Sequence, residues 1–256
     1  MQFIDTHTHL YLEEFDSDRD ESIAKAKSCG VEIFLIPNID SLSIGPLLNL
    51  AKAYPENCLP MIGLHPTSVK ENFLEELQMV EDLLGKHRFY AIGEIGIDLF
   101  WDKTFLEQQR EVFRRQLKLA KIANLPVAIH MRNSFEQTIK IIHEEADKNL
   151  RGVFHCFPGN IQQARQITDL GFFLGIGGVV TFKNSGLQQV VKEISLEHFL
   201  LETDAPFLAP APYRGKRNES SYIPLIADKI ALLKEISLAE VARITTDNAK
   251  RLFNLS

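Results

Sequence analysis

The sequence contains little cysteine, and its three thiols, Cys29, Cys58 and Cys156, form no CxxC pair. This spacing disfavours a zinc site built from thiolates, and a sparse, odd count is typical of a reducing compartment. The first residues, MQFIDTHTHL, lack the basic segment and long apolar run of a signal peptide. No stretch approaches the ~20 apolar residues of a membrane span. We therefore expect a cytoplasmic protein that does not act in a membrane.

The sequence also lacks an excess of positive charge, since its net charge is −6 at pH 7. Proteins that coat duplex DNA through their general electrostatic field carry broad basic surfaces, so this class is disfavoured. An enzyme that grips a strand end in one cleft is compatible with this charge, because bound metal ions reverse the local sign. No GxGxxG or P-loop motif follows the first apolar run, which argues against an open sheet that binds nucleotides.

Short apolar runs alternate with longer amphipathic segments along the whole chain. The 256 residues suit one large domain spanning 1–256, a length at which α/β barrels are common. The apolar runs cover eight segments: 3–9, 31–37, 59–66, 89–98, 125–131, 152–157, 172–180 and 198–206. Repeated strand and helix order implies parallel strands with right-handed crossovers. Eight such units predict the α/β class and a single closed (β/α)8 TIM barrel of the metal-dependent hydrolase type.

Helices are expected between the strands and at the end of the chain, over 106–123, 223–234 and 238–254. Three helix starts have capping-box spacing, in which a hydroxyl and a later side chain satisfy free backbone N–H groups. These pairs are Thr104 with Glu107, Ser134 with Gln137, and Ser237 with Glu240. Residues 209–221 are rich in proline and polar side chains and are expected to form an ordered loop.

Imidazoles and carboxylates gather where the expected strands end. Five of the eight histidines lie at such ends, together with two carboxylates: His7, His9, His65, His130, His155, Glu94 and Asp204. In a barrel these ends converge on the face where the loops build active sites. One buried histidine is commonly a hydrogen-bonded core residue, but several buried imidazoles and carboxylates without a cation would cost several kcal/mol per unpaired charge. The joint pattern therefore predicts a metal site.

Strand geometry indicates how these residues divide between two metals. His7 and His9 are two residues apart, so both rings face the barrel mouth and can close on one ion. His130 and His155 come from neighbouring strands, which lie ~4.8 Å apart, and can share a second ion. Glu94 has two oxygens, one for each ion.

Asp204 ends the last strand, which lies beside the first when the barrel closes. It can ligate the first metal and accept a proton from the attacking water, so Asp204 and Glu94 are the expected catalytic carboxylates. Metals lower the pKa of bound water towards neutrality and stabilise both the attacking and the leaving oxygen. A phosphodiester transition state concentrates negative charge, which metals and basic side chains stabilise.

Three further residues are expected to support the ligands. Asp5 and Glu202 precede His7 and Asp204 by two positions and could accept hydrogen bonds from ligand imidazoles. A buried salt bridge unrelated to metal is an equally good interpretation of both. His65, in the segment GLHP, could be a weak ligand, a phosphate contact or a structural residue, and a phosphate contact is favoured.

Basic and aromatic side chains near the expected mouth are candidates for substrate contacts. Arg132 follows His130 by two and should also face the mouth, while Arg214, Lys216 and Arg217 cluster after the last strand. All could hold phosphate oxygens, although charge runs are usually solvated loops. The aromatic pair at 100–101 (Phe-Trp) could stack on a base at a strand end, or simply pack within its loop or at an interface.

The motifs taken together resemble one family. IDTHTHL, GLHP, GEIGID, IHMR, HCF, ETDAP, RGKRNE and TTDNAKRLF occur in the order and spacing of TatD-family metal-dependent deoxyribonucleases, of the amidohydrolase-like superfamily. The resemblance implies a (β/α)8 barrel and magnesium-dependent DNase activity, often in the 3′→5′ exonuclease sense. It also implies six metal ligands: His7, His9, Glu94, His130, His155 and Asp204.

We therefore expect a deoxyribonuclease with two divalent metals that hydrolyses phosphodiesters of DNA through metal-bound hydroxide, as a 3′→5′ exonuclease on single strands or strand ends. The resemblance implies Mg²⁺, whereas an imidazole-rich ligand set suits Zn²⁺ or Mn²⁺ better. The expected partner is DNA, held locally in the cleft, with no obligatory protein partner. The alternatives are a hydrolase of small amides, lactones or esters, a deacylase of aminoacyl-tRNA, and a non-catalytic binding protein.

Overall fold

Eight parallel strands form the centre of the molecule in a computed structural model that describes residues 1–255. Each strand overlaps one of the eight expected apolar runs. The strands are β1 (Phe3–Asp5), β2 (Val31–Pro37), β3 (Cys58–Met61), β4 (Ile92–Asp98), β5 (Val127–Arg132), β6 (Gly152–Phe154), β7 (Phe173–Ile176) and β8 (Phe199–Leu201). The first strand ends at Asp5, earlier than expected, so His7 and His9 lie in the segment that follows it.

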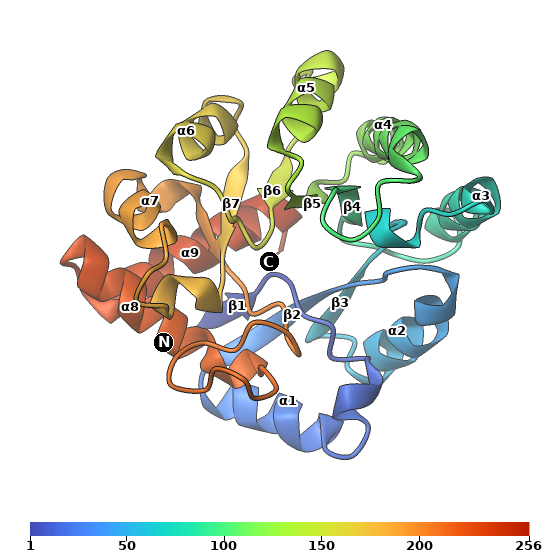
Figure 1. Ribbon diagram of the computed structural model, residues 1–256. Helices are drawn as coiled ribbons and strands as arrows, with labels where there is room; N and C mark the ends of the chain where they lie inside the picture. Colours follow the sequence, from blue (N-terminus) through green and yellow to red (C-terminus); the bar gives the residue numbers. More distant parts are fainter. Residues whose placement is uncertain (256) are drawn as a thin grey trace.

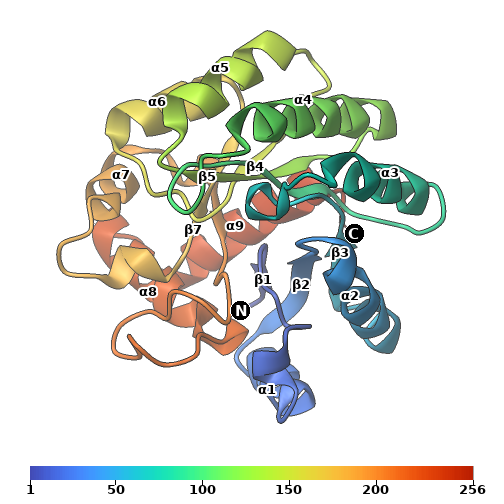
Figure 2. The same ribbon diagram turned by 45° about the vertical axis from the view of Figure 1, so that its right-hand side comes forward.

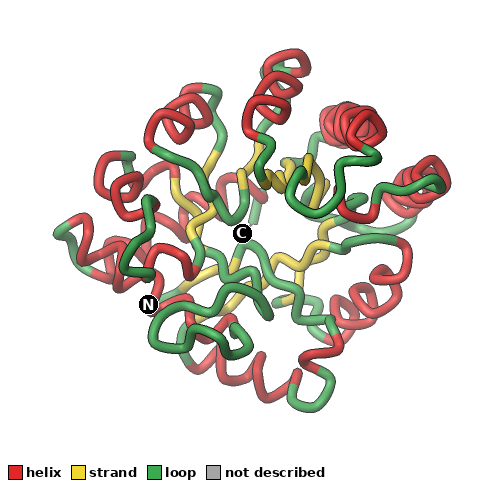
Figure 3. Tube along the Cα trace, in the orientation of Figure 1, coloured by secondary structure: helices red, strands yellow, loops and turns green. Residues whose placement is uncertain are grey.

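Helices surround the strands on the outside (Figures 1 and 3). The α-helices are α1 (Arg19–Ser28), α2 (Ser41–Ala53), α3 (Phe73–Leu84), α4 (Leu106–Ala123), α5 (Phe135–Glu145), α6 (Ile161–Asp169), α7 (Leu187–Glu193), α8 (Ile223–Lys234) and α9 (Leu238–Phe253). Short 3₁₀ helices occupy Glu13–Phe15, Pro66–Ser68, Gly178–Thr181, Leu196–His198 and Ser220–Tyr222. No helix within residues 1–255 is long and apolar enough to cross a membrane.

The strands close into a ring through two short joints. Ladders of hydrogen bonds connect β1 to β3 and β4 to β8 in sequence order. A bridge between Ile62 and Ile92 joins β3 to β4, and a bridge between Thr8 and Ala205 joins the ends of β1 and β8. The backbone N–H of Thr6 also donates to Leu201 O at 3.0 Å. The closed parallel barrel expected from the eight apolar runs is confirmed.

The barrel interior is packed and closed at one end by the last helix. One buried cluster takes apolar side chains from all eight strand segments and adds Ala249, Leu252 and Phe253 of α9. Figure 2 shows α9 running behind the strands and towards the C-terminus at the edge of the barrel. With the amino ends of the strands covered, the carboxyl ends are left to form a site.

Helix bounds agree with the expectations better than helix caps do. α4 and α8 occupy the expected residues, and α9 ends at Phe253. Ser237 caps α9 by accepting a hydrogen bond from the N–H of Glu240 at 3.1 Å, which confirms the hydroxyl half of the expected capping box. The other two capping boxes are wrong: α4 has Phe105 at its N-cap, and the Ser134 hydroxyl donates to Ile97 O at 2.6 Å. The Ser134 hydroxyl therefore bonds to a carbonyl of β4 and not to the N–H groups at the start of α5.

Candidate metal centre

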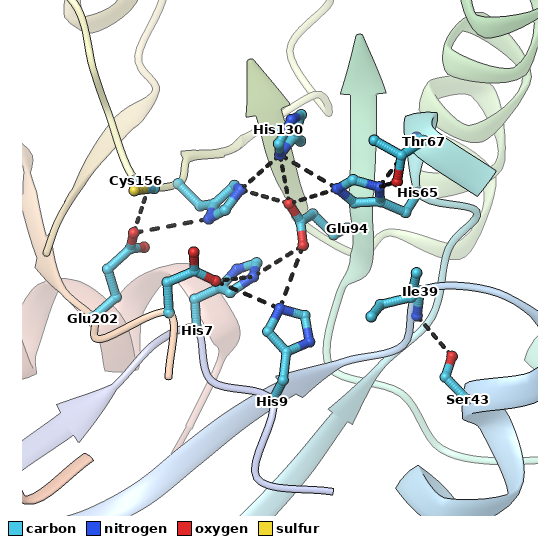
Figure 4. Close-up of polar contacts among 12 residues, drawn as sticks. His7, His9, Ile39, Ser43, His65, Thr67, Glu94, His130, Cys156 and Glu202 are labelled. Carbon is cyan, nitrogen blue, oxygen red and sulfur yellow. Dashed lines mark hydrogen bonds and ion pairs between the residues drawn. The ribbon is translucent and has the colours of Figure 1, made fainter. Parts of the chain in front are cut away.

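The carboxyl ends of six strands bring together the imidazoles and carboxylates that the sequence analysis singled out (Figure 4). Backbone hydrogen bonds fix the segment after β1, since the N–H of Thr8 donates to Leu35 O at 3.1 Å and that of His9 to Ala205 O at 2.7 Å. The N–H of Asp204 donates to His7 O at 2.9 Å. The first and last strands therefore hold their ligands against each other.

One oxygen of Glu94 faces the histidines that follow β1. Glu94 Oε2 lies 3.2 Å from His7 Nε2 and 3.6 Å from His9 Nε2. Asp204 Oδ1 lies 3.5 Å from His9 Nε2 and 3.8 Å from His7 Nε2. Two imidazoles and two carboxylate oxygens therefore surround one point, as expected for the first metal.

The other oxygen of Glu94 faces three different imidazoles. Glu94 Oε1 lies 2.6 Å from His155 Nε2, 2.7 Å from His130 Nδ1 and 3.1 Å from His65 Nε2. The rings of His130 and His155 also approach each other, with their facing nitrogens 3.3 Å apart. The carboxylate thus has one oxygen for each group of imidazoles, which is the arrangement that a bridging ligand needs.

The donor set at this point fits a cation. Asp98 Oδ2 lies 2.9 Å from His130 Nε2, which places a ring proton on that nitrogen and leaves the Nδ1 lone pair aimed at Glu94. A lone pair facing a carboxylate is repulsive unless a proton or a metal ion lies between them. Three groups have ligand atoms within 4.8 Å of one another: His7, His9 and Glu94; His65, Glu94 and His130; and His7, His155 and Asp204. These residues are able to bind metal.

Asp98 is a residue that the sequence analysis missed. Its carboxylate fixes the tautomer of His130, as acceptors beside metal-binding histidines commonly do. Burial disfavours the charged ring of His130, but the hydrogen bonds to Asp98 and Glu94 outweigh it and raise the His130 pKa to about 9. Without a metal, a proton therefore lies between Nδ1 and Glu94, in the place that a cation would take. The available signal was strand period two, because Glu94 and Asp98 are four residues apart in β4 and face the same side.

His65 differs from the other histidines in its tautomer. The N–H of Thr67 donates to His65 Nδ1 at 3.2 Å, so the proton of the neutral ring lies on Nε2. Burial lowers the pKa of His65, which keeps the ring neutral. Its Nε2–H therefore points at Glu94, and His65 is better suited to donate a hydrogen bond than to ligate a metal.

Asp204 lies at the mouth of the site and is the more accessible of the two catalytic candidates. Its side chain is 14% exposed, against 4% for Glu94. Its φ of 58° lies in the left-handed region, where strain is typical of functional positions. Burial opposes ionisation, but the hydrogen bond with His9 and the nearby His155 and His7 outweigh it and lower the Asp204 pKa. The ionised carboxylate is the form that accepts a proton.

The charges of the buried centre are distributed unequally. Burial opposes ionisation of Glu94, but the imidazoles of His155, His65 and His7 outweigh it and hold the Glu94 pKa well below its usual value. Burial and the neighbouring His155 lower the pKa of His7 to about 4. The centre therefore combines an ionised carboxylate with a neutral imidazole, the protonation states in which both groups ligate metals.

The two carboxylates expected to orient imidazoles have different environments. Glu202 lies beside the ring of His155, with Oε1 3.8 Å from Nδ1, and its carboxylate accepts the N–H of Cys156. Burial and repulsion from Asp204 raise the pKa of Glu202 well above its usual value. Three polar atoms in this region are buried without a hydrogen-bond partner within residues 1–255: His7 Nδ1, His155 Nδ1 and Glu202 Oε2.

Asp5 contacts backbone and hydroxyl groups rather than an imidazole. It accepts hydrogen bonds from the N–H of Thr203 at 3.0 Å, the Thr203 hydroxyl at 2.6 Å and the N–H of His7 at 3.3 Å. Burial raises the pKa of Asp5 to about 6. Both alternatives considered for Asp5, an imidazole acceptor and a salt bridge, are replaced by a joint between β1 and the end of β8.

A cleft of about 740 Å³ opens above the centre. Its lining includes Glu94, Asp204, His65 and Arg132 together with apolar side chains. Arg132 therefore lies at the cleft, as the period of β5 predicts.

The loop after β8 directs its arginines elsewhere. Arg217 forms a two-point ion pair with Asp18, at 2.7 and 2.6 Å, and covers the ring of Phe15 at 4.5 Å. Arg214 lies 4.2 Å above the ring of Phe182. Within residues 1–255 the cleft lining includes neither arginine. The structure therefore places both guanidinium groups on partners within the protein, and a phosphate contact by either stays a prediction.

Comparisons with known proteins give the same picture. The sequence model of the TatD-related DNase family matches residues 4–254. The chain belongs to this family. It is 42% identical over 253 residues to the metal-dependent hydrolase YabD of Bacillus subtilis, covering 98% of this chain and 99% of that protein.

Two further relatives of this TatD family member are similar over nearly the whole chain. The 3′-5′ ssDNA/RNA exonuclease TatD of Erwinia tasmaniensis is 34% identical, covering 98% of this chain and 99% of that protein. The crystal structure of YjjV, a TatD homologue from Escherichia coli K12, superposes with a TM-score of 0.91 at 31% identity, covering 99% of this chain and 98% of the other. The family, the barrel and the assignment as a metal-dependent hydrolase are thereby established.

Proposed function

We propose that this protein is a divalent-metal-dependent deoxyribonuclease that hydrolyses phosphodiester bonds at the 3′ ends of single-stranded DNA. The observation that carries the proposal is the position of Glu94, with one oxygen towards His7 and His9 and the other towards His130 and His155. Two cation sites that share a carboxylate suit the displacement of one phosphate oxygen by another. The relative from Erwinia tasmaniensis, an exonuclease by name, supports the choice of substrate.

In this proposal the two metals would be held by His7, His9 and Asp204 and by His130 and His155, with Glu94 shared. They would lower the pKa of water and neutralise charge on the phosphate. The ligand set, rich in imidazole, favours Zn²⁺ or Mn²⁺ as resident ions, whereas Mg²⁺ remains the ion implied by the family.

The residues of the chain would carry the rest of the reaction. Asp204 takes the proton of the attacking water as the new P–O bond forms, because it is ionised and reaches the cleft. The bond to the 3′ oxygen breaks, and that oxygen takes a proton from solvent. Arg132 holds a phosphate oxygen, and Nε2–H of His65 can turn from Glu94 to donate to another.

The first experiment is digestion of a single-stranded oligonucleotide by protein stripped with a chelator and then given Mg²⁺, Mn²⁺ or Zn²⁺ separately. We expect one or more ions to restore cleavage from the 3′ end. The Glu94→Gln variant should lose turnover and bind metal more weakly. Asp204→Asn should lower kcat about 10²- to 10⁴-fold, the contribution of a general base. Glu144→Gln, which removes a half-exposed partner of Arg114, is the control and should keep full activity.

A second candidate function is hydrolysis of a small lactone, ester or amide at the same centre. The observation that favours it is the cleft, which combines a volume suited to small ligands with apolar lining such as Met131, Phe157 and Leu187. Metal-dependent turnover of lactones or esters without cleavage of any oligonucleotide would replace our first proposal. An aminoacyl-tRNA in the same panel tests the deacylase alternative.

A further inference from the structure

Exposed apolar side chains gather at the mouth of the cleft. Four large apolar residues with 44–70% exposure lie there: Phe100, Trp101, Phe207 and Leu208. Trp101, Phe207 and Leu208 line the cleft itself. Large exposed apolar groups that surround a polar centre usually mark a contact surface for a ligand. The mouth is therefore built to receive a flat or apolar group next to the metal centre.

Trp101 is part of a cluster of two aromatic rings and one guanidinium group at this mouth. Its ring meets that of Phe100 edge-on, with centroids 4.8 Å apart. The guanidinium of Arg132 lies 3.9 Å above the ring of Phe100 and 5.4 Å from that of Trp101. An aromatic face bordered by an arginine offers stacking and a positive charge to the same ligand.

The carboxylate of Asp98 fixes this unit relative to the metal centre. Asp98 Oδ1 accepts the N–H groups of Phe100 at 2.8 Å and Trp101 at 3.2 Å, while its Oδ2 contacts His130. Asp98 is itself buried. One side chain therefore fixes the orientation of a candidate metal-binding imidazole and the position of the backbone that carries the aromatic pair.

Positive charge around the cleft is scarce. Among the residues of 1–255 that line the cleft, Arg132 is the single lysine or arginine. A protein that follows a nucleic-acid backbone over many nucleotides uses a groove with many basic groups. Apart from the phosphate at the metal centre, the cleft can hold few phosphates, so further affinity has to come from another part of the substrate.

We infer that Trp101, with Phe100 and Arg132 beside it, is a stacking platform for a nucleobase, and that the site holds a strand end by one base and the adjacent phosphate. The inference rests on the proposed function for its substrate and adds what recognises that substrate. It favours unpaired bases, because a base inside a duplex is stacked on both faces and a terminal pair exposes only its outer face. It also predicts weak dependence of binding on salt.

Trp101 is the single tryptophan of the chain, so tryptophan emission reports directly on the platform. The probe is a thymidine trinucleotide with phosphorothioate links that resist hydrolysis, added to metal-loaded protein. We expect saturable quenching and an affinity about 5- to 150-fold higher than for the matched abasic trimer, the range of base–aromatic stacking. The slope of log affinity against log salt should be no steeper than about −1. Equal affinity for the two trimers would overturn the platform.

Kinetics of the full-length protein supply the second test. Trp101→Ala should raise KM for the normal trinucleotide about 5- to 150-fold without changing KM for the abasic one, and Trp101→Phe should restore most of the loss. Ile122→Ala, which truncates an exposed apolar residue at 84% exposure on α4, is the control. The inference fails when Trp101→Ala changes both substrates equally or neither.

The two proposals can fail separately. Base-dependent quenching without turnover of any phosphodiester would retain the platform and remove the proposed hydrolysis. Turnover with quenching that ignores the base would retain the hydrolysis and remove the platform.

Discussion

The floor of the cleft and the loop after β8 both carry charged residues at the same end of the barrel. On the floor, Glu94 and His130 lie within strands, and both keep the neighbours that strand geometry assigns them. In the loop, Arg217 turns to Asp18 and Phe15. A residue in a strand has its direction set by the backbone ladder, whereas a loop residue takes the strongest partner within reach.

This difference shows which sequence motifs predict the direction of a side chain and which do not. RGKRNE is as recognisable in the sequence as GEIGID, but the two have different parts in the structure. Asn218 of the first motif is buried and its amide donates to Thr203 O and Phe207 O, so this motif shapes the loop that borders the cleft. Arg217 of the same motif then secures the loop to Glu14 O, in the 3₁₀ helix Glu13–Phe15, and to Asp18, which precedes α1.

Among the variants that compare the floor with the loop, Asp98→Asn is expected to have the largest effect. It tests whether metal binding on the floor needs a residue that is not itself a ligand. The amide keeps the oxygen that accepts the N–H groups of Phe100 and Trp101 but presents N–H to His130 Nε2. Metal affinity should fall about 10- to 100-fold, as for other partners of ligand histidines. Competition with a fluorescent chelator measures this change.

The matched control for that variant is Asp147→Asn. Asp147 Oδ1 accepts the N–H groups of Asn149 at 2.8 Å and Leu150 at 3.0 Å, so it forms the same local turn far from any metal ligand. Equal metal affinity in the two variants would mean that Asp98 acts only through its turn.

An intermediate effect is expected when the two arginines are compared directly. Arg132→Ala removes the cation of the cleft and should raise KM for oligonucleotides about tenfold, the loss of one charged hydrogen bond. Arg217→Ala should leave KM unchanged, because its guanidinium is held by Asp18. Steady-state kinetics at fixed metal concentration measure both. A larger change in KM for Arg217→Ala than for Arg132→Ala would mean that the loop after β8 contacts the substrate.

The smallest effect concerns pH and the loop. Hydrogen bonds from Arg217 lower the pKa of Asp18 below its ordinary value of 3.8. The pair therefore stabilises the folded protein above that value, and its contribution is lost as pH falls through the lower pKa of the folded state. At neutral pH, Arg217→Ala should cost about 0.5 kcal/mol, since the pair is only partly buried.

Thermal unfolding of both proteins across acid and neutral pH measures this loss. The difference in Tm should narrow as pH falls below 3.8. A difference that is constant over this range would assign the loss to packing of Arg217 on Phe15 instead.

The strands and most residues of the candidate metal centre could be predicted from the sequence, and the reason is physical. Apolar runs between amphipathic segments mark strands buried on both faces, and a parallel barrel brings their carboxyl ends together. Glu94, His130 and Asp204 follow from that alone. Where two hydrogen-bond partners compete for one side chain, the sequence could not predict the outcome. The Ser134 hydroxyl donates to a strand carbonyl instead of capping its helix, and Asp5 accepts from Thr203 instead of from an imidazole. Asp98 was open to prediction from strand period but carried no metal-binding motif of its own.

The hydrogen bonds between Asp5 and Thr203 join residues 198 positions apart. His7 and His9 leave the ribosome almost at once, whereas Asp204 and the strand before it emerge only after most of the barrel has been made. The centre is therefore incomplete until β8 and the segment after it have been made. A chain that stops before this strand lacks Asp204 and cannot assemble the full set of candidate ligands.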